Sequence, residues 1–278
     1  MIHFAPSKPT RLTPARSLQA MGTLGAVMAM AILAMSVLLR LTTVFAADGA
    51  TSSNLPTAVE DVARLIHRLS ASGVGLLALL ASVVCWRHRR AVPNAVMPVA
   101  LIAASTVMLA LIGPLTAGYR FTAVTVANVV GGTMLLASCW WLRETLAAMA
   151  PRHPVDRPLL TAMLIVFFVH VTTGAATSAL NTHGITRFAA IHQASAMLTI
   201  VLLGAILWDS RHDARLSRLF TTMKWLLGAQ IALGLTAMWP GAQAPWFALL
   251  HALVSPLLAA GLVSVAVRGA PTQPGPVR

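Results

Sequence analysis

Residues 66–71 read Ile66-His67-Arg68-Leu69-Ser70-Ala71, and residues 191–196 read Ile191-His192-Gln193-Ala194-Ser195-Ala196. Each stretch begins a long apolar run, which ends in Trp86-Arg87-His88-Arg89 in the first case and in Trp208-Asp209-Ser210-Arg211-His212 in the second. The two histidines are 125 residues apart. The similarity indicates an internal repeat, and the recurring histidine indicates a paired binding site.

The composition is that of an integral membrane protein. Of the 278 residues, 57% are hydrophobic and 10% are charged, and the mean hydropathy is +0.77, whereas about a quarter of the residues of a soluble domain are charged. About 20 apolar residues cross a bilayer as a helix, which satisfies its own backbone hydrogen bonds. The sequence predicts eight such spans, at residues 21–45, 66–86, 95–117, 121–142, 158–180, 188–208, 219–239 and 246–267.

Membrane topology explains the net charge of +13 better than nucleic-acid binding does. Basic residues precede the first apolar run and follow the second, fourth, sixth and eighth, and few lie at the opposite ends. This alternation follows the positive-inside rule and predicts that both termini are cytoplasmic. We therefore expect a multi-pass protein of the inner (cytoplasmic) membrane, with the lipid bilayer around it and no nucleic acid as partner.

The repeat extends over most of the chain. Leu39-Arg40-Leu41-Thr42-Thr43 corresponds to Val169-His170-Val171-Thr172-Thr173, and Asn128 in the fourth run corresponds to His251 in the eighth. Each half has an even number of runs, so both insert with the same orientation and the repeat is parallel.

We predict an all-α membrane protein of eight transmembrane helices arranged as two tandem four-helix bundles. The N-terminal bundle covers residues 21–145 and the C-terminal bundle residues 155–268, and cytoplasmic tails occupy residues 1–20 and 269–278.

Three histidines are the candidate metal ligands. Ionisable residues inside a membrane are costly and usually functional, and imidazole without a cysteine or carboxylate partner suits haem iron better than zinc. His192 and His251 could bind one iron from both faces of a porphyrin. His67 has Asn128 as its counterpart, so iron there would keep an open position, unless the site has decayed. All three are expected within a turn or two of the outer ends of their helices.

Other polar residues near these positions have two interpretations. His170 is expected to cap or pack its helix rather than to bind metal. Arg40 and Arg68 either donate to haem propionates or extend their side chains to the outer membrane interface.

With these features the chain resembles the haem A synthase family, whose fold is two tandem four-helix bundles. The resemblance covers essentially all eight runs. It rests on Ile66-His67-Arg68, Ile191-His192-Gln193, Leu250-His251 and Arg40-Leu41-Thr42. Members of the family oxidise a methyl group of haem O to the formyl group of haem A for cytochrome oxidase.

The resemblance implies particular roles for the histidines. His192 and His251 would hold haem b, and haem O, the substrate, would bind beside His67 and Arg68. An external electron donor would be needed. Haem O synthase, cytochrome oxidase assembly factors and a second copy of the chain stay open as partners.

Two positions depart from the family pattern. The family has a carboxylate one turn before the first histidine, where this chain has Arg64, and Asn128 replaces a second histidine. The nearest acids are Glu60 and Asp61, and Glu60 is the candidate catalytic residue if the loop folds back; otherwise it is a solvated carboxylate.

Three functions therefore remain open. The first is a haem A synthase-like oxidoreductase, and the second is a non-catalytic b-type haem protein or oxidase assembly factor. The third, a transporter built on tandem repeats, is less favoured because the fourth and eighth runs lack paired Gly/Pro interruptions.

Overall fold

The computed structural model describes residues 13–47, 57–113, 122–147, 156–180, 187–209, 216–238 and 245–269, and over these residues the fold is all-α. Its α-helices are α1 (Pro14–Ala47), α2 (Thr57–Arg87), α3 (Val96–Ile112), α4 (Thr122–Ala147), α5 (Arg157–Leu180), α6 (Arg187–Asp209), α7 (Ser217–Met238) and α8 (Pro245–Arg268). A short 3₁₀ helix, η1 (Pro93–Ala95), precedes α3. Helix α1 begins inside the segment that was predicted as a cytoplasmic tail.

Seven of the described helices, α1 to α6 and α8, are long and apolar enough to cross a membrane. Many of their large apolar side chains point outward, among them Leu69, Leu79 and Val201. A soluble protein rarely exposes so much apolar surface, so these faces suit a lipid bilayer. Helix α7 is not among the seven, because Lys224 and Gln230 lower its hydropathy.

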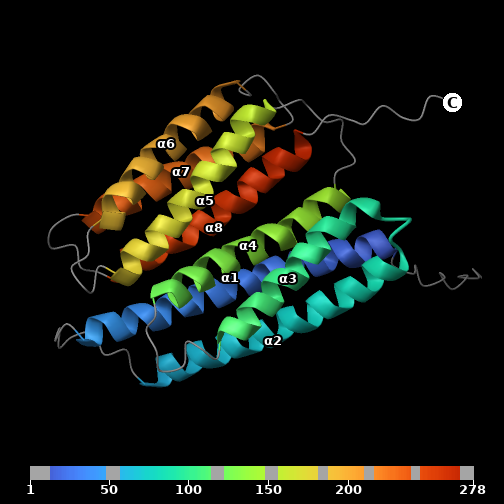
Figure 1. Cartoon of the computed structure of the whole chain (residues 1–278), viewed down its shortest axis with the longest axis horizontal. Coiled ribbons are helices and arrows are strands. Elements are labelled where there is room, and N and C mark those ends of the chain that lie inside the picture. Colours follow the sequence, from blue (N-terminus) through green and yellow to red (C-terminus); the bar gives the residue numbers. More distant parts are fainter. Residues whose placement is uncertain are drawn as a thin grey trace, which may run out of the picture.

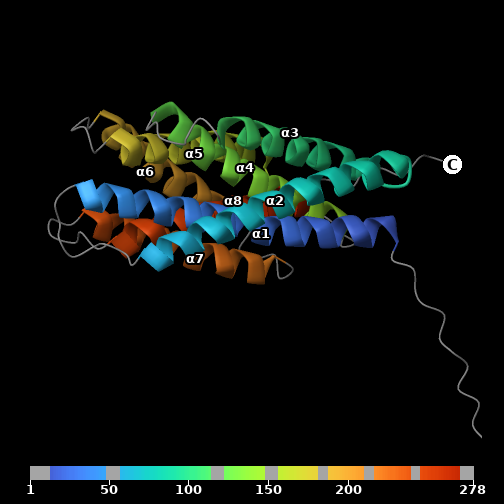
Figure 2. The same cartoon turned by 90° about the horizontal axis from the view of Figure 1, so that it is seen from below.

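The helices form two groups that pack side by side (Figure 1). In the N-terminal group, α1 packs on α2 and α4, and α3 packs on α2 and α4. In the C-terminal group, α5 packs on α6 and α7 packs on α8. The groups meet along α4, which contacts both α5 and α8, and α1 also contacts α8. Figure 2 shows that the helices of both groups run roughly along one direction.

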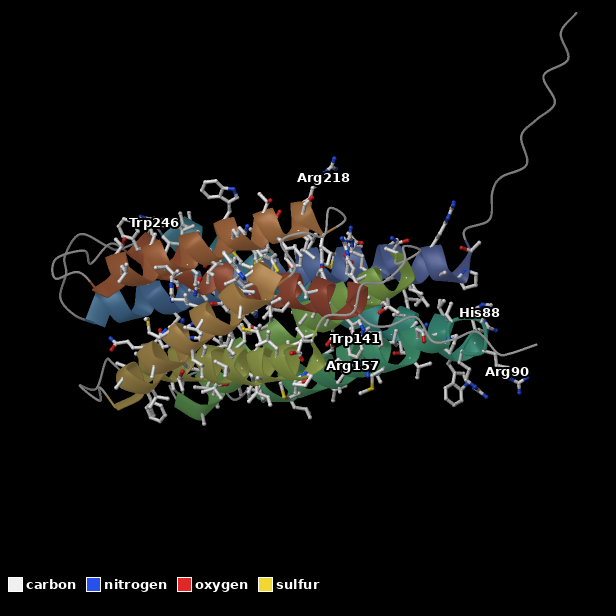
Figure 3. All side chains as sticks on the ribbon, turned by 90° about the horizontal axis from the view of Figure 1, so that it is seen from above. His88, Arg90, Trp141, Arg157, Arg218 and Trp246 are labelled. Atoms are coloured by element: carbon white, nitrogen blue, oxygen red, sulfur yellow. The ribbon has the colours of Figure 1, made fainter. Side chains whose placement is uncertain are left out.

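Basic residues and a tryptophan lie toward opposite ends of the helices. Figure 3 shows His88 and Arg90, which follow α2, at one end of the molecule, and Trp246, at the start of α8, toward the other. Tryptophan and basic side chains are typical of the two water interfaces of a membrane protein. The helix axes therefore follow the direction expected for spanning segments.

The two groups differ in how tightly they close. In the N-terminal group α1 lies against α4 so closely that a Cβ added to Gly22 would stand 2.8 Å from the backbone oxygen of Cys139, and small residues permit such approach in membranes. In the C-terminal group the corresponding helices, α5 and α8, contact each other only sparsely over the described residues. The C-terminal group is therefore two hairpins, α5–α6 and α7–α8, that are loosely joined.

The apolar core of the C-terminal group lies toward one end of its helices. Its most buried members include Met163, Leu203, Met223 and Leu262. These residues lie nearer the start of α5 and α7 and the end of α6 and α8. The opposite end of the same group carries the histidines.

Helix α2 begins nine residues earlier than the predicted span. Thr57 starts the helix, Glu60 lies in its first turn, where an acidic residue stabilises the helix dipole, and Glu60 forms an i,i+4 ion pair with Arg64. Polar residues thus extend the helix beyond the apolar run. His67 is ten residues into α2, about 15 Å from its first residue, so the prediction that it lies within a turn or two of the helix end is wrong. The prediction holds for His192 and His251.

Candidate functional site

Three histidines from three helices meet in the C-terminal group. The rings of His170 in α5 and His192 in α6 are stacked, with centroids 4.3 Å apart and an interplanar angle of 12°. The ring of His251 in α8 is nearly perpendicular to that of His192, with centroids 6.2 Å apart. The structure therefore brings together His192 and His251, which the sequence had paired. His170 is only 4% exposed, and its ring packs on that of His192 in the neighbouring helix.

The ring of His192 is held by helix α5. Its Nδ1 lies 3.1 Å from the backbone oxygen of His170, a carbonyl whose second lone pair remains available after its helical hydrogen bond. With a proton on Nδ1, this contact is a hydrogen bond that fixes the tautomer and leaves Nε2 as the acceptor nitrogen. A Cβ added to Gly174 would stand 2.8 Å from Cε1 of His192, so glycine makes room for the ring.

The ring of His251 is held in a similar way by helix α7. Its Nε2 lies 3.3 Å from Nε2 of Gln230, which also donates to Oγ of Ser255 at 2.8 Å. A Cβ added to Gly234 would stand 3.1 Å from Cε1 of His251. The other ring nitrogen, Nδ1, is buried and has no hydrogen-bond partner in the described part of the chain.

His192 and His251 are thus supported alike, although they belong to different hairpins. Each ring lies over a glycine of the preceding helix, and each has one nitrogen facing a polar group of that helix. This is how proteins orient a histidine that binds metal: one nitrogen takes the metal, and the other donates to a carbonyl, carboxylate or water.

In the N-terminal group His67 contacts helix α1. Its Nδ1 lies 3.4 Å from both Oγ of Ser36 and the backbone oxygen of Ile32. The contact with a carbonyl of the preceding helix repeats that of His192. Asn128 is half-buried in α4. Beside this site the helices are closely packed, since a Cβ added to Gly132 would stand 2.6 Å from Cδ2 of Leu33.

Glu60 is not in a loop, contrary to the alternative that the sequence left open. It lies in the first turn of α2, half-buried, and pairs with Arg64. Glu60 is seven residues before His67, which places it on the same face of the helix but about 10 Å away along the axis. Asp61 and Arg68 are exposed.

A set of polar contacts joins α4 and α8, and we call it the α4–α8 seam. It was not predicted from the sequence. Glu144 is 1% exposed and pairs with Arg143 of its own helix and, at 2.9 Å, with Nε of Arg268. One turn away, Nε1 of Trp140 donates to Oγ of Ser264 at 2.8 Å. These contacts join the two groups of helices.

An apolar cavity lies in the N-terminal group, apart from the histidines. Its volume is about 10 Å³, and it is lined by residues of α1, α2, α3 and α4, among them Met21, Val74, Ile102 and Cys139. Pockets that bind small molecules are usually larger, at about 300–1,000 Å³. We assign it no role.

Comparison with known proteins gives no relative: no protein-family model, no curated protein and no solved structure matches the chain. Within the described residues, no group of three or more His, Cys, Asp or Glu side chains is arranged to hold a metal ion. The geometry of the histidines is therefore the basis for assigning a function.

Proposed function

We propose that the chain is a haem A synthase-like oxidoreductase that holds haem b between His192 and His251. The observation that carries the proposal is the matched support of these two rings, each with one nitrogen facing a polar group of the preceding helix. Ligand histidines in metalloproteins are oriented in this manner. Bound haem would supply the electron-transfer chemistry.

The separation of the ring centroids would allow His192 and His251 to hold one iron together. A metal–imidazole bond is about 2.0 Å long, so two histidines that held one iron would bring their ligating nitrogens to about 4 Å from each other. The ring centroids of His192 and His251, which lie farther back than the nitrogens, are 6.2 Å apart. Haem needs only two protein ligands, because the porphyrin supplies four nitrogens, and a cluster of three or more ligand side chains is not required.

The loose contact between the two C-terminal hairpins also favours this half as the haem site. His192 lies in one hairpin and His251 in the other, and the helices α5 and α8 contact each other sparsely. A flat macrocycle between the two rings would require the hairpins to move apart at this end, while the apolar core at the other end holds them together. The closely packed contact of Leu33 with Gly132 beside His67 must open further to admit a haem.

The proposed architecture is eight spanning helices in a parallel repeat, with α7 as the eighth span. Residues near a two-fold axis contact their own equivalents. Trp140 and Ser264 are 124 residues apart, as are Glu144 and Arg268, and this offset is within one residue of the 125 residues between the repeated histidines and of the 123 residues between Asn128 and His251. The seam between α4 and α8 therefore lies where the axis of such a repeat would run. Both termini would be cytoplasmic and the histidines would lie toward the outer side of the inner membrane.

In this proposal the N-terminal group binds haem O, with His67 and Arg68 as its contacts. The substrate methyl group would be oxidised in two two-electron steps, through an alcohol to a formyl group. An external oxidant must accept these electrons; if that oxidant is dioxygen, the external donor would supply two further electrons in each step to reduce its second oxygen atom to water. Glu60 is the nearest carboxylate on the face of His67, and it must leave Arg64 to accept a proton from the substrate. Haem O synthase and oxidase assembly factors are the partners that would deliver haem O and receive haem A.

A second candidate is a non-catalytic b-type haem membrane protein or oxidase assembly factor. The ion pair between Glu60 and Arg64 favours it, because Arg64 occupies the carboxylate that the oxidation would need. Asn128 in place of a histidine favours it too. In this case the C-terminal haem would remain and the N-terminal group would have no substrate.

The test is to purify the protein from a host that makes haem O and to identify the haems that it retains. Haem A or its alcohol intermediate supports the oxidoreductase, and haem b alone supports the second candidate. Absence of haem contradicts both. The variants His192→Ala and His251→Ala should lose haem b, whereas His88→Ala, an exposed histidine beyond the end of α2, should retain it.

A further inference from the structure

Gln230 is a polar side chain in the middle of a predicted membrane span. It is 7% exposed and lies in the contact between α7 and α8. A buried amide is costly in an apolar region unless its donors and acceptor are paired. Its presence therefore requires a compensating interaction.

The pairing of Gln230 is incomplete. Nε2 donates to Oγ of Ser255 and faces Nε2 of His251, but Oε1 is buried and has no partner among the described residues. His251 also has an unpaired buried nitrogen, Nδ1. Two unsatisfied polar atoms at one place in a native structure usually indicate a missing ligand, ion or water, or a functional role.

We infer that Gln230 is the positioning residue that orients His251 as a haem ligand; this rests on the proposed function. When one ring nitrogen of His251 binds iron, the other carries a proton and needs an acceptor. Turning the amide over exchanges its nitrogen and oxygen. Oε1 then accepts hydrogen bonds from the His251 ring and from the Ser255 hydroxyl, and the amide NH2 takes the buried position that Oε1 has in the present orientation.

The other ligand has an equivalent partner. Nδ1 of His192 faces the backbone oxygen of His170 in α5, and the ring of His251 faces the side chain of Gln230 in α7. The preceding helix supplies the acceptor in both hairpins, once from the backbone and once from an amide. An acceptor of this kind fixes the ring and makes the imidazole a better electron donor to the metal.

The competing explanation is that Gln230 only holds α7 against α8 through its hydrogen bond with Ser255. The two explanations differ for Ser255→Ala, which removes the tie and keeps the contact between Gln230 and His251. They also differ for Gln230→Glu, which places a stronger acceptor beside the ring.

The experiment uses the full-length protein in detergent, loaded with iron protoporphyrin IX. The haem dissociation constant, the midpoint potential and the ferric low-spin EPR spectrum are measured for the wild type, Gln230→Leu, Gln230→Glu and Ser255→Ala. Gln230→Leu should weaken haem binding about 10- to 100-fold and raise the potential, because a less basic imidazole stabilises ferric iron less. Gln230→Glu should lower the potential, and Ser255→Ala should leave it close to the wild-type value. Opposite shifts cannot come from loosened packing alone.

The outcomes separate this inference from the proposed function. If the wild type binds haem and His251→Ala loses it, but Gln230→Leu and Ser255→Ala give the same potential and affinity as each other, Gln230 is only a tie between helices and the inference is wrong. If His251→Ala retains haem with an unchanged spectrum, the proposed site is wrong and the inference fails with it. Circular dichroism and size-exclusion chromatography check that each variant is folded.

Discussion

Gly174 lies directly beside the imidazole of His192: a Cβ at Gly174 would stand 2.8 Å from Cε1 of that ring. A Cβ atom this close to a ring carbon would overlap it, so Gly174→Ala must displace the ring or the helix. We expect Gly174→Ala to lose most of its haem b, measured as haem per protein after purification.

The matched control for this substitution is Gly204→Ala in α6. A Cβ at Gly204 would meet no atom within 4 Å, and alanine is a better helix former than glycine by about 0.5–1 kcal/mol. Haem content should therefore be unchanged, and thermal stability should not fall. Equal haem loss in both variants would mean that the proximity of Gly174 to His192 has no role in the site.

Gly234 supports His251 with slightly more space. An added Cβ would stand 3.1 Å from Cε1 of His251, a distance that a small ring shift relieves. Gly234→Ala should keep a larger share of its haem than Gly174→Ala but change the visible and EPR spectra. Gly228→Ala in the same helix, where a Cβ would meet no atom within 4 Å, is the control and should have the wild-type spectra.

Glu144 and Arg268 should be energetically coupled across the α4–α8 seam. Glu144 is 1% exposed and Arg268 is 41% exposed, so the loss of Arg268 leaves a buried carboxylate with Arg143 as its remaining partner. Double-mutant cycles on such contacts usually give about 0.5–3 kcal/mol. We expect a coupling in this range from Glu144→Gln and Arg268→Gln, measured by unfolding in detergent. Additive effects would show that the pair does not hold the groups together.

Much of the fold could be predicted from the sequence, because apolar runs long enough to span a bilayer are a strong signal. The start of α2 could not, since Glu60 and Arg64 extend the helix with an ion pair rather than with apolar residues. The pairing of His192 with His251 followed from the repeat. Gly174 could not be found in this way, because a glycine is informative only once the ring beside it is known.

The polar residues that support the site and join α4 to α8 are harder to predict from the sequence than the apolar spans. Gln230 stands out as an amide within an apolar run, a residue type that usually marks a function in membranes. Glu144 lies at the end of a run, where a charged residue is ordinary, and its pairing with Arg268 depends on how the two groups of helices meet.

Helix α7 should cross the membrane although Lys224 and Gln230 lower its hydropathy and it is not among the seven most apolar candidates. It has 22 residues, about 33 Å, enough for the hydrocarbon region. Gln230 faces the interior at α8 rather than the lipid, and Lys224, seven residues from the start of the helix, can extend to the interface. Topology reporters fused after residues 212 and 242 should therefore report opposite sides of the membrane, with the first in the cytoplasm. Fusions on either side of α8 calibrate the assay. If both α7 fusions reported the same side, α7 would not cross the membrane. The C-terminal half would then have an odd number of spans, and the repeat could not be parallel.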